Sequence, residues 1–176
     1  TYEKQTDAGT YAATFSLKDK TNTVWSDNKT GDKTVNWSIG KANGSGSVTM
    51  DGWTYGDTAS NPVPTSSTNG TNNVTYKYKV STAADSTYTT TKPSAAGTYT
   101  VQATFATTTN YNAVTATANF TISKRSITIP SQKGTLTYNA EKQTPSWNNY
   151  DTNWMTIGGT YEKQTDAGTY AATFSL

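Results

Sequence analysis

TYEKQTDAGTYAATFSL occupies residues 1–17 and occurs again, without a single difference, as residues 160–176. Homologous domains diverge, so a perfect match of this length indicates one long unit repeated in tandem. The offset between the two copies is 159 residues (160 minus 1), and the chain therefore spans slightly more than one period. We expect the chain to begin and end inside a module.

The repeated segment itself has the pattern of a strand. Its apolar residues Tyr11, Ala13, Phe15 and Leu17 alternate with small or polar ones, which is typical of a strand with one buried face. Thr and Tyr are frequent and only three residues are Leu, a composition that favours strands over helices. Four further segments alternate in the same way: Val35–Ile39, Val74–Val80, Tyr99–Phe105 and Val114–Ile122.

Internal matches show that one period holds two related modules. The motif AGTY opens a strand at Ala8, Ala96 and Ala167, and ANFTISK (118–124) matches VNWSIGK (35–41). Boundaries then fall near residues 43 and 125, and the two modules together fill the period. Residues 1–43 are the C-terminal part of module A, 44–125 are a complete module B, and 126–176 are the N-terminal part of the next module A.

The two modules also begin alike. Short apolar strands are expected at Val48–Met50 and at Ile127–Ile129. After each, a Thr-Tyr pair leads to a proline with the same spacing, from Tyr55 in module B and from Tyr138 in module A. We therefore predict an all-β fold: two small antiparallel β-sandwich or β-grasp-like modules per repeat, arranged end to end.

Several segments of the sequence resemble a known class of repeat modules. In module B these are VTMDGWTYGDTASNP (48–62), AGTYTVQATF (96–105) and TNYNAVTATANFTISK (109–124). They are similar to the mostly-bacterial β-grasp and Ig-like repeat modules of giant cell-surface proteins. LTYNAEKQTP (136–145), DAGTYAATFSL (7–17) and VWSDNKTGDKTVNWSI (24–39) resemble a companion module from the same arrays.

The resemblance implies an extracellular protein at the cell surface or cell wall, with repeats that act as a stalk or adhesin. A β-grasp carries a helix across its sheet, and no amphipathic helix is present in the pattern. Ser81–Asp85 is the one place for a helical turn. We therefore expect all-β modules.

Composition argues against several other classes of function. The net charge is only +2 and no cluster of Lys and Arg is present, which argues against a nucleic-acid partner. No apolar stretch is long enough to span a membrane. His is absent, which removes the commonest general base and the commonest metal ligand, and Cys is absent, which excludes disulfides. We expect no enzyme, no cofactor and no metal site.

Three kinds of chemistry remain as alternatives to a purely structural role. Asn36 and Asn119 occupy equivalent strands, as a Lys–Asn cross-link would need, but the alternation places both on the solvated face. SDNKTGD, residues 26–32, contains acids that could bind calcium, although its composition is that of an ordinary turn. Trp147 and Trp154 lie in loop-like stretches and could stack on a glycan, although core packing is the preferred interpretation.

The halves of module A should need each other, because a piece of this size cannot bury enough surface alone. We expect them to join by strand pairing with a neighbouring repeat, in the same chain or head to tail between chains. The duplicated 17-residue segment favours the same chain, because its two copies would compete for one place between chains. The apolar residues expected to mediate that pairing are Tyr11, Phe15, Leu17, Tyr170, Phe174 and Leu176. The predicted function is a non-catalytic structural repeat of a bacterial surface fibre or adhesin stalk. The alternative is a repeat that binds host or cell-wall glycans, or a protein.

Overall fold

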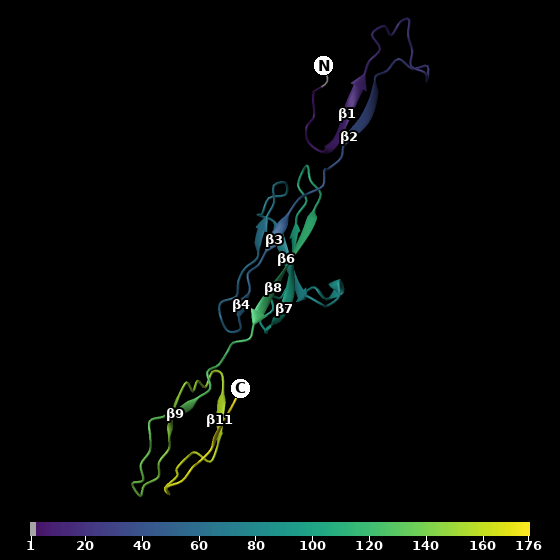
Figure 1. Cartoon of the computed structure of the whole chain (residues 1–176). Helices are drawn as coiled ribbons and strands as arrows, with labels where there is room; N and C mark the ends of the chain where they lie inside the picture. Colours follow the sequence, from purple (N-terminus) through teal and green to yellow (C-terminus); the bar gives the residue numbers. More distant parts are fainter. Residues whose placement is uncertain (1–2) are drawn as a thin grey trace. The chain divides into compact units, whose positions relative to one another are not determined.

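The computed structural model describes residues 3–176 and is all-β, as predicted (Figure 1). Twelve strands and one 3-10 helix, η1 (Asp85–Thr87), are present in the described range. The 3-10 helix lies at the C-terminal end of the segment in which the sequence allowed a helical turn. The chain divides between Lys124 and Arg125 into two compact units. Unit 1 contains the residues up to Lys124, and unit 2 is Arg125–Leu176.

The largest sheet of unit 1 has four strands in the order β4-β8-β7-β6. β7 is antiparallel to both of its neighbours, whereas β4 runs parallel to β8. The strands are β4 (Trp53–Thr54), β6 (Val74–Val80), β7 (Gly97–Phe105) and β8 (Val114–Ser123). β6, β7 and β8 are the strands that the alternation of apolar and polar residues predicted.

A second, smaller layer covers this sheet. β3 (Ser47–Thr49) pairs with β5 (Val63–Thr65), and β3 contacts β7 and β8. Val48 and Met50 are buried there with three fully buried side chains, Val101, Phe105 and Ile122. The two layers enclose one core, so module B is a small β-sandwich.

The N-terminal hairpin of unit 1 reproduces half of this sheet. β1 (Gly9–Phe15) pairs with β2 (Lys33–Ile39), and Gly9 lies opposite Ile39. In module B, Gly97 lies opposite Ile122 in the same way. The AGTY motif therefore has the same register against the following strand in both modules.

Aromatic pairs follow from that register. Tyr11 lies opposite Trp37 with ring centroids 5.0 Å apart, and Tyr99 lies opposite Phe120 with centroids 5.7 Å apart. Phe120 is also covered by Trp53 from β4, at 5.5 Å between centroids. In the described residues of the hairpin no strand corresponding to β4 lies beside β2, and Trp37 is 42% exposed.

Unit 2 consists of two short two-stranded sheets. β9 (Ser131–Lys133) pairs with β10 (Ser146–Asn148), and β11 (Thr156–Gly159) pairs with β12 (Ala172–Ser175). Phe174 of β12 packs edge to face against Trp147 of β10, with centroids 5.1 Å apart. Met155 is the one large side chain of unit 2 that is almost fully buried.

One predicted strand is wrong. Ile127–Ile129 is not a strand, and the first strand of unit 2 begins at Ser131. Pro130, directly after this segment, has no N–H to donate to a ladder and is tolerated only at a sheet edge, as Pro64 is in β5. The second reason is packing: Val48 of β3 is buried under β8, whereas Ile129 has no such cover and is 84% exposed.

Candidate functional site

The two copies of the repeated segment have different strand partners. The N-terminal copy pairs as β1 with β2, which follows it in sequence. The C-terminal copy pairs as β12 with β11, which precedes it. In module B the equivalent strand, β7, has partners on both edges. One partner is β6, which precedes it in sequence, and the other is β8, which follows it.

Backbone hydrogen bonds show which edge of the C-terminal copy pairs with β11. The Thr160 N–H donates to the Ala171 carbonyl at 2.9 Å, so the main-chain groups of Ala171 are directed at β11. Neighbouring residues of an extended strand direct their main-chain groups to opposite edges. The groups of Ala172 are therefore directed away from β11, at the opposite edge of the segment.

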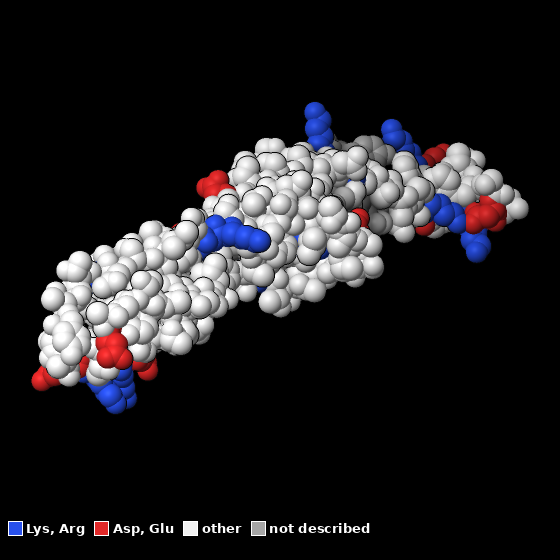
Figure 2. Space-filling model, turned by 60° about the horizontal axis from the view of Figure 1, so that its bottom comes forward, with Lys and Arg blue, Asp and Glu red and all other residues white. Residues whose placement is uncertain are grey.

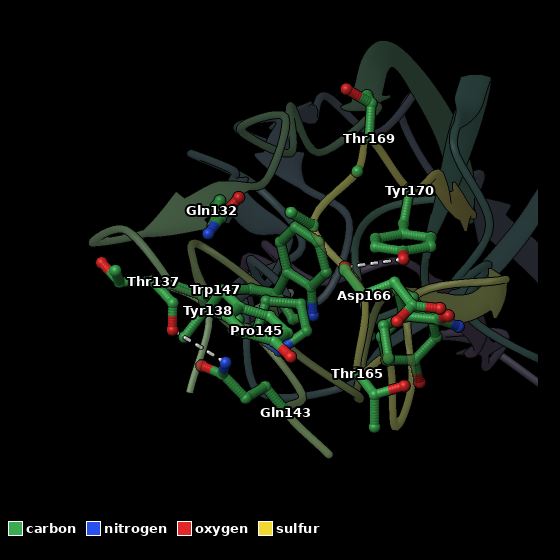
Figure 3. Close-up of a pocket in the computed structure, with 15 residues that line it drawn as sticks. Gln132, Thr137, Tyr138, Gln143, Pro145, Trp147, Thr165, Asp166, Thr169 and Tyr170 are labelled. Carbon is green, nitrogen blue, oxygen red and sulfur yellow. Dashed lines mark hydrogen bonds between the residues drawn. The ribbon is translucent and has the colours of Figure 1, made fainter. Parts of the chain in front are cut away.

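A cavity of about 490 Å³ lies beside this segment of unit 2 (Figure 3). Residues 165–170 of the repeated segment line one side, and Leu136, Thr137 and Tyr138 line another. Aromatic and amide side chains and one proline complete the wall: Gln132, Gln143, Pro145, Trp147, Tyr161 and Gln164.

Hydrogen bonds inside unit 2 fix the shape of this cavity. The Gln143 amide donates to the Thr137 carbonyl at 2.9 Å, and the Tyr170 hydroxyl donates to the Asp166 carbonyl at 2.8 Å (Figure 3). Gln143 and Gln164 also form a backbone bridge, with N–H to carbonyl distances of 2.8 and 3.0 Å. The wall thus combines amide, hydroxyl and main-chain polar groups with aromatic rings.

Asp166 is the only charged residue in that wall. Burial and the neighbouring Glu162 carboxylate raise the pKa of the Tyr161 phenol above its ordinary value. Tyr161 is therefore a neutral hydrogen-bonding group at physiological pH. A wall with a single charged side chain fits a neutral polypeptide segment or a sugar better than a highly charged ligand.

The residues expected to mediate pairing lie in different surroundings in the two copies. Tyr11 packs on Trp37, and Phe15 ends β1. The equivalent Phe174 packs on Trp147, while Tyr170 lines the cavity and is 41% exposed. Leu17 and Leu176 lie outside the strands, and Leu176 is 92% exposed.

The two tryptophans proposed for glycan stacking do not share a site. Trp147 lies in β10 rather than in a loop, and its ring meets Phe174 and Tyr161. It lines the cavity, but Trp154 does not. Trp154 lies in a turn, and the Arg125 guanidinium is 5.1 Å from its ring centroid.

The acidic turn of the N-terminal hairpin is held by ion pairs. Lys33 bonds Asp27, and Lys20 bonds Asp32 at 3.1 Å. These lysines are the main reason that the pKa values of both carboxyls lie below their ordinary range. Within residues 3–176 no group of three or more His, Cys, Asp or Glu side chains could hold a metal ion.

Charged side chains elsewhere are sparse. On the face shown in Figure 2 they lie singly or in small mixed groups. Asn36 and Asn119, considered for a cross-link, are both exposed, and Asn119 accepts a hydrogen bond from the Thr100 hydroxyl at 2.7 Å.

Sequence reasoning missed Leu136–Tyr138 as part of a site. The signal was present, because the match between the two Thr-Tyr-to-Pro segments places Leu136 at the position of Trp53. Trp53 belongs to β4, the edge strand that lies beside β8. That Leu136 lies at a position where a strand can pair follows only once the pairing of β4 with β8 is known.

No family model, no curated protein and no solved structure matches the chain. In the described part of the chain there is no helix of the length and apolarity needed to cross a membrane.

Proposed function

We propose that this chain is a non-catalytic structural repeat of an extracellular bacterial surface fibre or adhesin stalk. One observation carries the proposal: β1–β2 and β7–β8 have the same register, with Gly9 opposite Ile39 and Gly97 opposite Ile122. The chain therefore contains two versions of one sheet design in succession. A spacer built by repetition needs this kind of unit.

The chemistry of the surface supports a spacer. Thr, Ser, Asn and Tyr are frequent in the sequence, and three ion pairs form among residues 3–176, two of them between exposed side chains. Such a surface is well solvated and carries little net charge. It suits a stalk that must remain extended and inert.

The size and location of the native polypeptide test this proposal. An antibody raised against unit 1 should detect a band far above 18.9 kDa on denaturing electrophoresis, and it should label intact cells. A band at the mass of the chain itself, or labelling only after permeabilisation, would contradict a surface array.

A second candidate is a repeat that binds glycans. The observation in its favour is the aromatic wall of the cavity, in which Trp147, Tyr138 and Tyr161 converge. A glycan array with the chain and with Trp147→Ala separates the two functions. A spacer gives no selective signal, whereas a lectin gives a signal that the substitution removes.

A further inference from the structure

We propose that the cavity of unit 2 is an acceptor site for β2 (Lys33–Ile39) of a second copy of this chain. The inserted strand would lie between Leu136–Thr137 on one side and the C-terminal copy of the repeated segment on the other. The inference rests on the proposed repeat architecture, because the equivalent positions of the two modules define both the site and its occupant.

Module B shows what occupies the corresponding position. There β8 lies between β4 and β7. Ile122 of β8 has Trp53 as its parallel partner on one side and Gly97 as its antiparallel partner on the other. The equivalents of those two partners in unit 2 are Leu136 and Gly168, and both line the cavity. The cavity is thus the place of a strand like β8.

The N-terminal hairpin shows which segment fits. Its strand β1 has the same residues as the C-terminal copy, and it pairs with β2 over its whole length. Transferred to unit 2, that register places Ile39 opposite Gly168 and Trp37 opposite Tyr170. The Trp37 ring would then lie on the Tyr170 ring, as it lies on Tyr11 within the hairpin.

The exposed apolar side chains of the two surfaces are complementary. On β2, Val35 is 54% exposed and Trp37 is 42% exposed. On the acceptor, Leu136 is 50% and Tyr138 is 63% exposed. In module B the corresponding contact, Trp53 on Phe120, is a stacked pair. Insertion would bury these exposed apolar side chains of β2 and of the acceptor against each other.

The exchange conserves every ladder contact of β2, and it leaves β1 of the donor molecule without its partner strand. When β2 leaves its own β1 and enters unit 2 of another molecule, it meets the same residues in the same order. The ladder lost from β1 is therefore matched by the ladder gained at the acceptor. The additional packing of Leu136 and Tyr138 on the inserted strand favours the exchanged form.

The resulting assembly is open. The donor strand belongs to unit 1 and the acceptor to unit 2, so the contact joins two different surfaces and is heterologous. Each molecule can donate at one end and accept at the other. Copies would join head to tail as filaments.

A pair of introduced cysteines tests the register. Because the chain has no Cys, Ser38→Cys combined with Thr169→Cys gives only the intended thiols. Ser38 lies opposite Thr10, whose counterpart is Thr169, and both chosen positions are exposed. Facing residues of antiparallel strands have the spacing that a disulfide needs. Asn36→Cys with Thr169→Cys is the matched control, two residues out of register on the same face.

After refolding at high concentration and oxidation, the Ser38/Thr169 variant should form a ladder of linked dimers and larger species. We expect at least about tenfold more of these than the control forms, because disulfides demand close approach of the two Cβ atoms. Equal linkage in both variants, or none in either, would refute the site. A linked monomer would show that β2 of the same chain is the occupant and would also refute it.

Charge substitutions give a second readout that does not depend on cysteines. Leu136→Asp alters an exposed acceptor residue, whereas Ile129→Asp places the same charge on an exposed residue outside this cavity. In sedimentation velocity, the concentration-dependent association of the unsubstituted chain should disappear with Leu136→Asp and persist with Ile129→Asp. Loss in both, or in neither, would overturn the assignment.

These results are separable from those for the proposed function. A surface array with no strand exchange would give a high native mass but no linked species. Strand exchange without a surface array would give linked species, with a native polypeptide of small mass inside the cell. A selective glycan signal that Leu136→Asp and Trp147→Ala both remove, without linkage, would assign the cavity to a sugar instead.

Discussion

Two residues of module B lie where the structure has no spare volume, Gly52 and Phe105. A Cβ added to Gly52 would lie 2.4 Å from the Thr121 carbonyl oxygen, which is backbone and cannot move aside alone. Phe105 is completely buried. At Gly31, in the hairpin turn, nothing lies within 4 Å of an added Cβ. Single residues thus differ sharply in what they tolerate.

Gly52→Ala is expected to destabilise module B by roughly 1–3 kcal/mol, the usual range for overpacking. The methyl group would separate Gly52 from β8 and weaken the adjacent pairing of β4. Urea unfolding followed by tryptophan fluorescence measures the change. Gly31→Ala is the control and should leave the midpoint unchanged. Equal midpoints for Gly52→Ala and the unsubstituted chain would contradict the close approach.

Phe105→Ala removes a fully buried ring and should lower the stability of module B by about 3–5 kcal/mol. Phe15, which ends the strand equivalent to β7, is 40% exposed and serves as the comparison. We expect Phe15→Ala to have a much smaller effect in the same unfolding experiment. Similar losses at both positions would mean that the hairpin and module B share one core.

Among the strands, β6 carries a buried tyrosine that makes the stability of the fold depend on pH. Its Tyr78 is 6% exposed and meets Phe120 edge to face, with centroids 6.3 Å apart. Burial, with a smaller contribution from the neighbouring Tyr76, raises the pKa of the Tyr78 phenol above its reference of 10.0. Folding therefore favours the neutral phenol.

This shift predicts a loss of stability in alkali. Below pH 10 both states keep the phenol neutral, so the full stability is present. Above pH 10 the unfolded chain ionises first, and the free energy of unfolding falls until the folded-state pKa is passed. Urea midpoints at neutral pH and at about pH 10.5 should differ less in Tyr78→Phe than in the unsubstituted chain. An equal difference would place the alkaline sensitivity elsewhere.

The strands that the sequence predicted are those with strong alternation. β6, β7 and β8 are long, and their apolar residues lie on the core face, so local pattern and tertiary packing agree. β11 has the sequence TIGG and no alternation. It forms because its backbone hydrogen-bonds to β12, so the sequence of β11 alone does not predict it.

The candidate site could be predicted only in part, and again only where the sequence alternates. Tyr170 was identified because it belongs to the alternating repeated segment. Leu136 and Tyr138 belong to no strand, and their side chains are exposed, so no local pattern marks them. Their importance comes from the non-local pairing of β4 with β8, which a single sequence does not show.

Across the whole chain, the hydrophobic core is distributed unevenly. Of the nearly buried large side chains among the described residues, Met155 alone belongs to unit 2. All the others lie in module B: Val48, Met50, Tyr78, Val101, Phe105, Phe120 and Ile122. Module B therefore has the means to fold by itself, and unit 2 has little apolar burial to offset its loss of conformational entropy.

Fragments should show this difference directly. Residues 44–125 alone are expected to give a cooperative thermal transition and dispersed amide resonances in NMR. Residues 126–176 alone should show neither until a partner strand is supplied. A cooperative transition in the smaller fragment by itself would contradict the view that its sheet is incomplete.

The shared register of β1–β2 and β7–β8 also bears on how such a gene can change. In the proposed array, recombination between the segments that encode the two identical 17-residue sequences would add or remove one whole period. Every strand would still meet its usual partner afterwards. The length of the encoded protein could therefore vary in steps during evolution while the folding instructions in each remaining period stay intact.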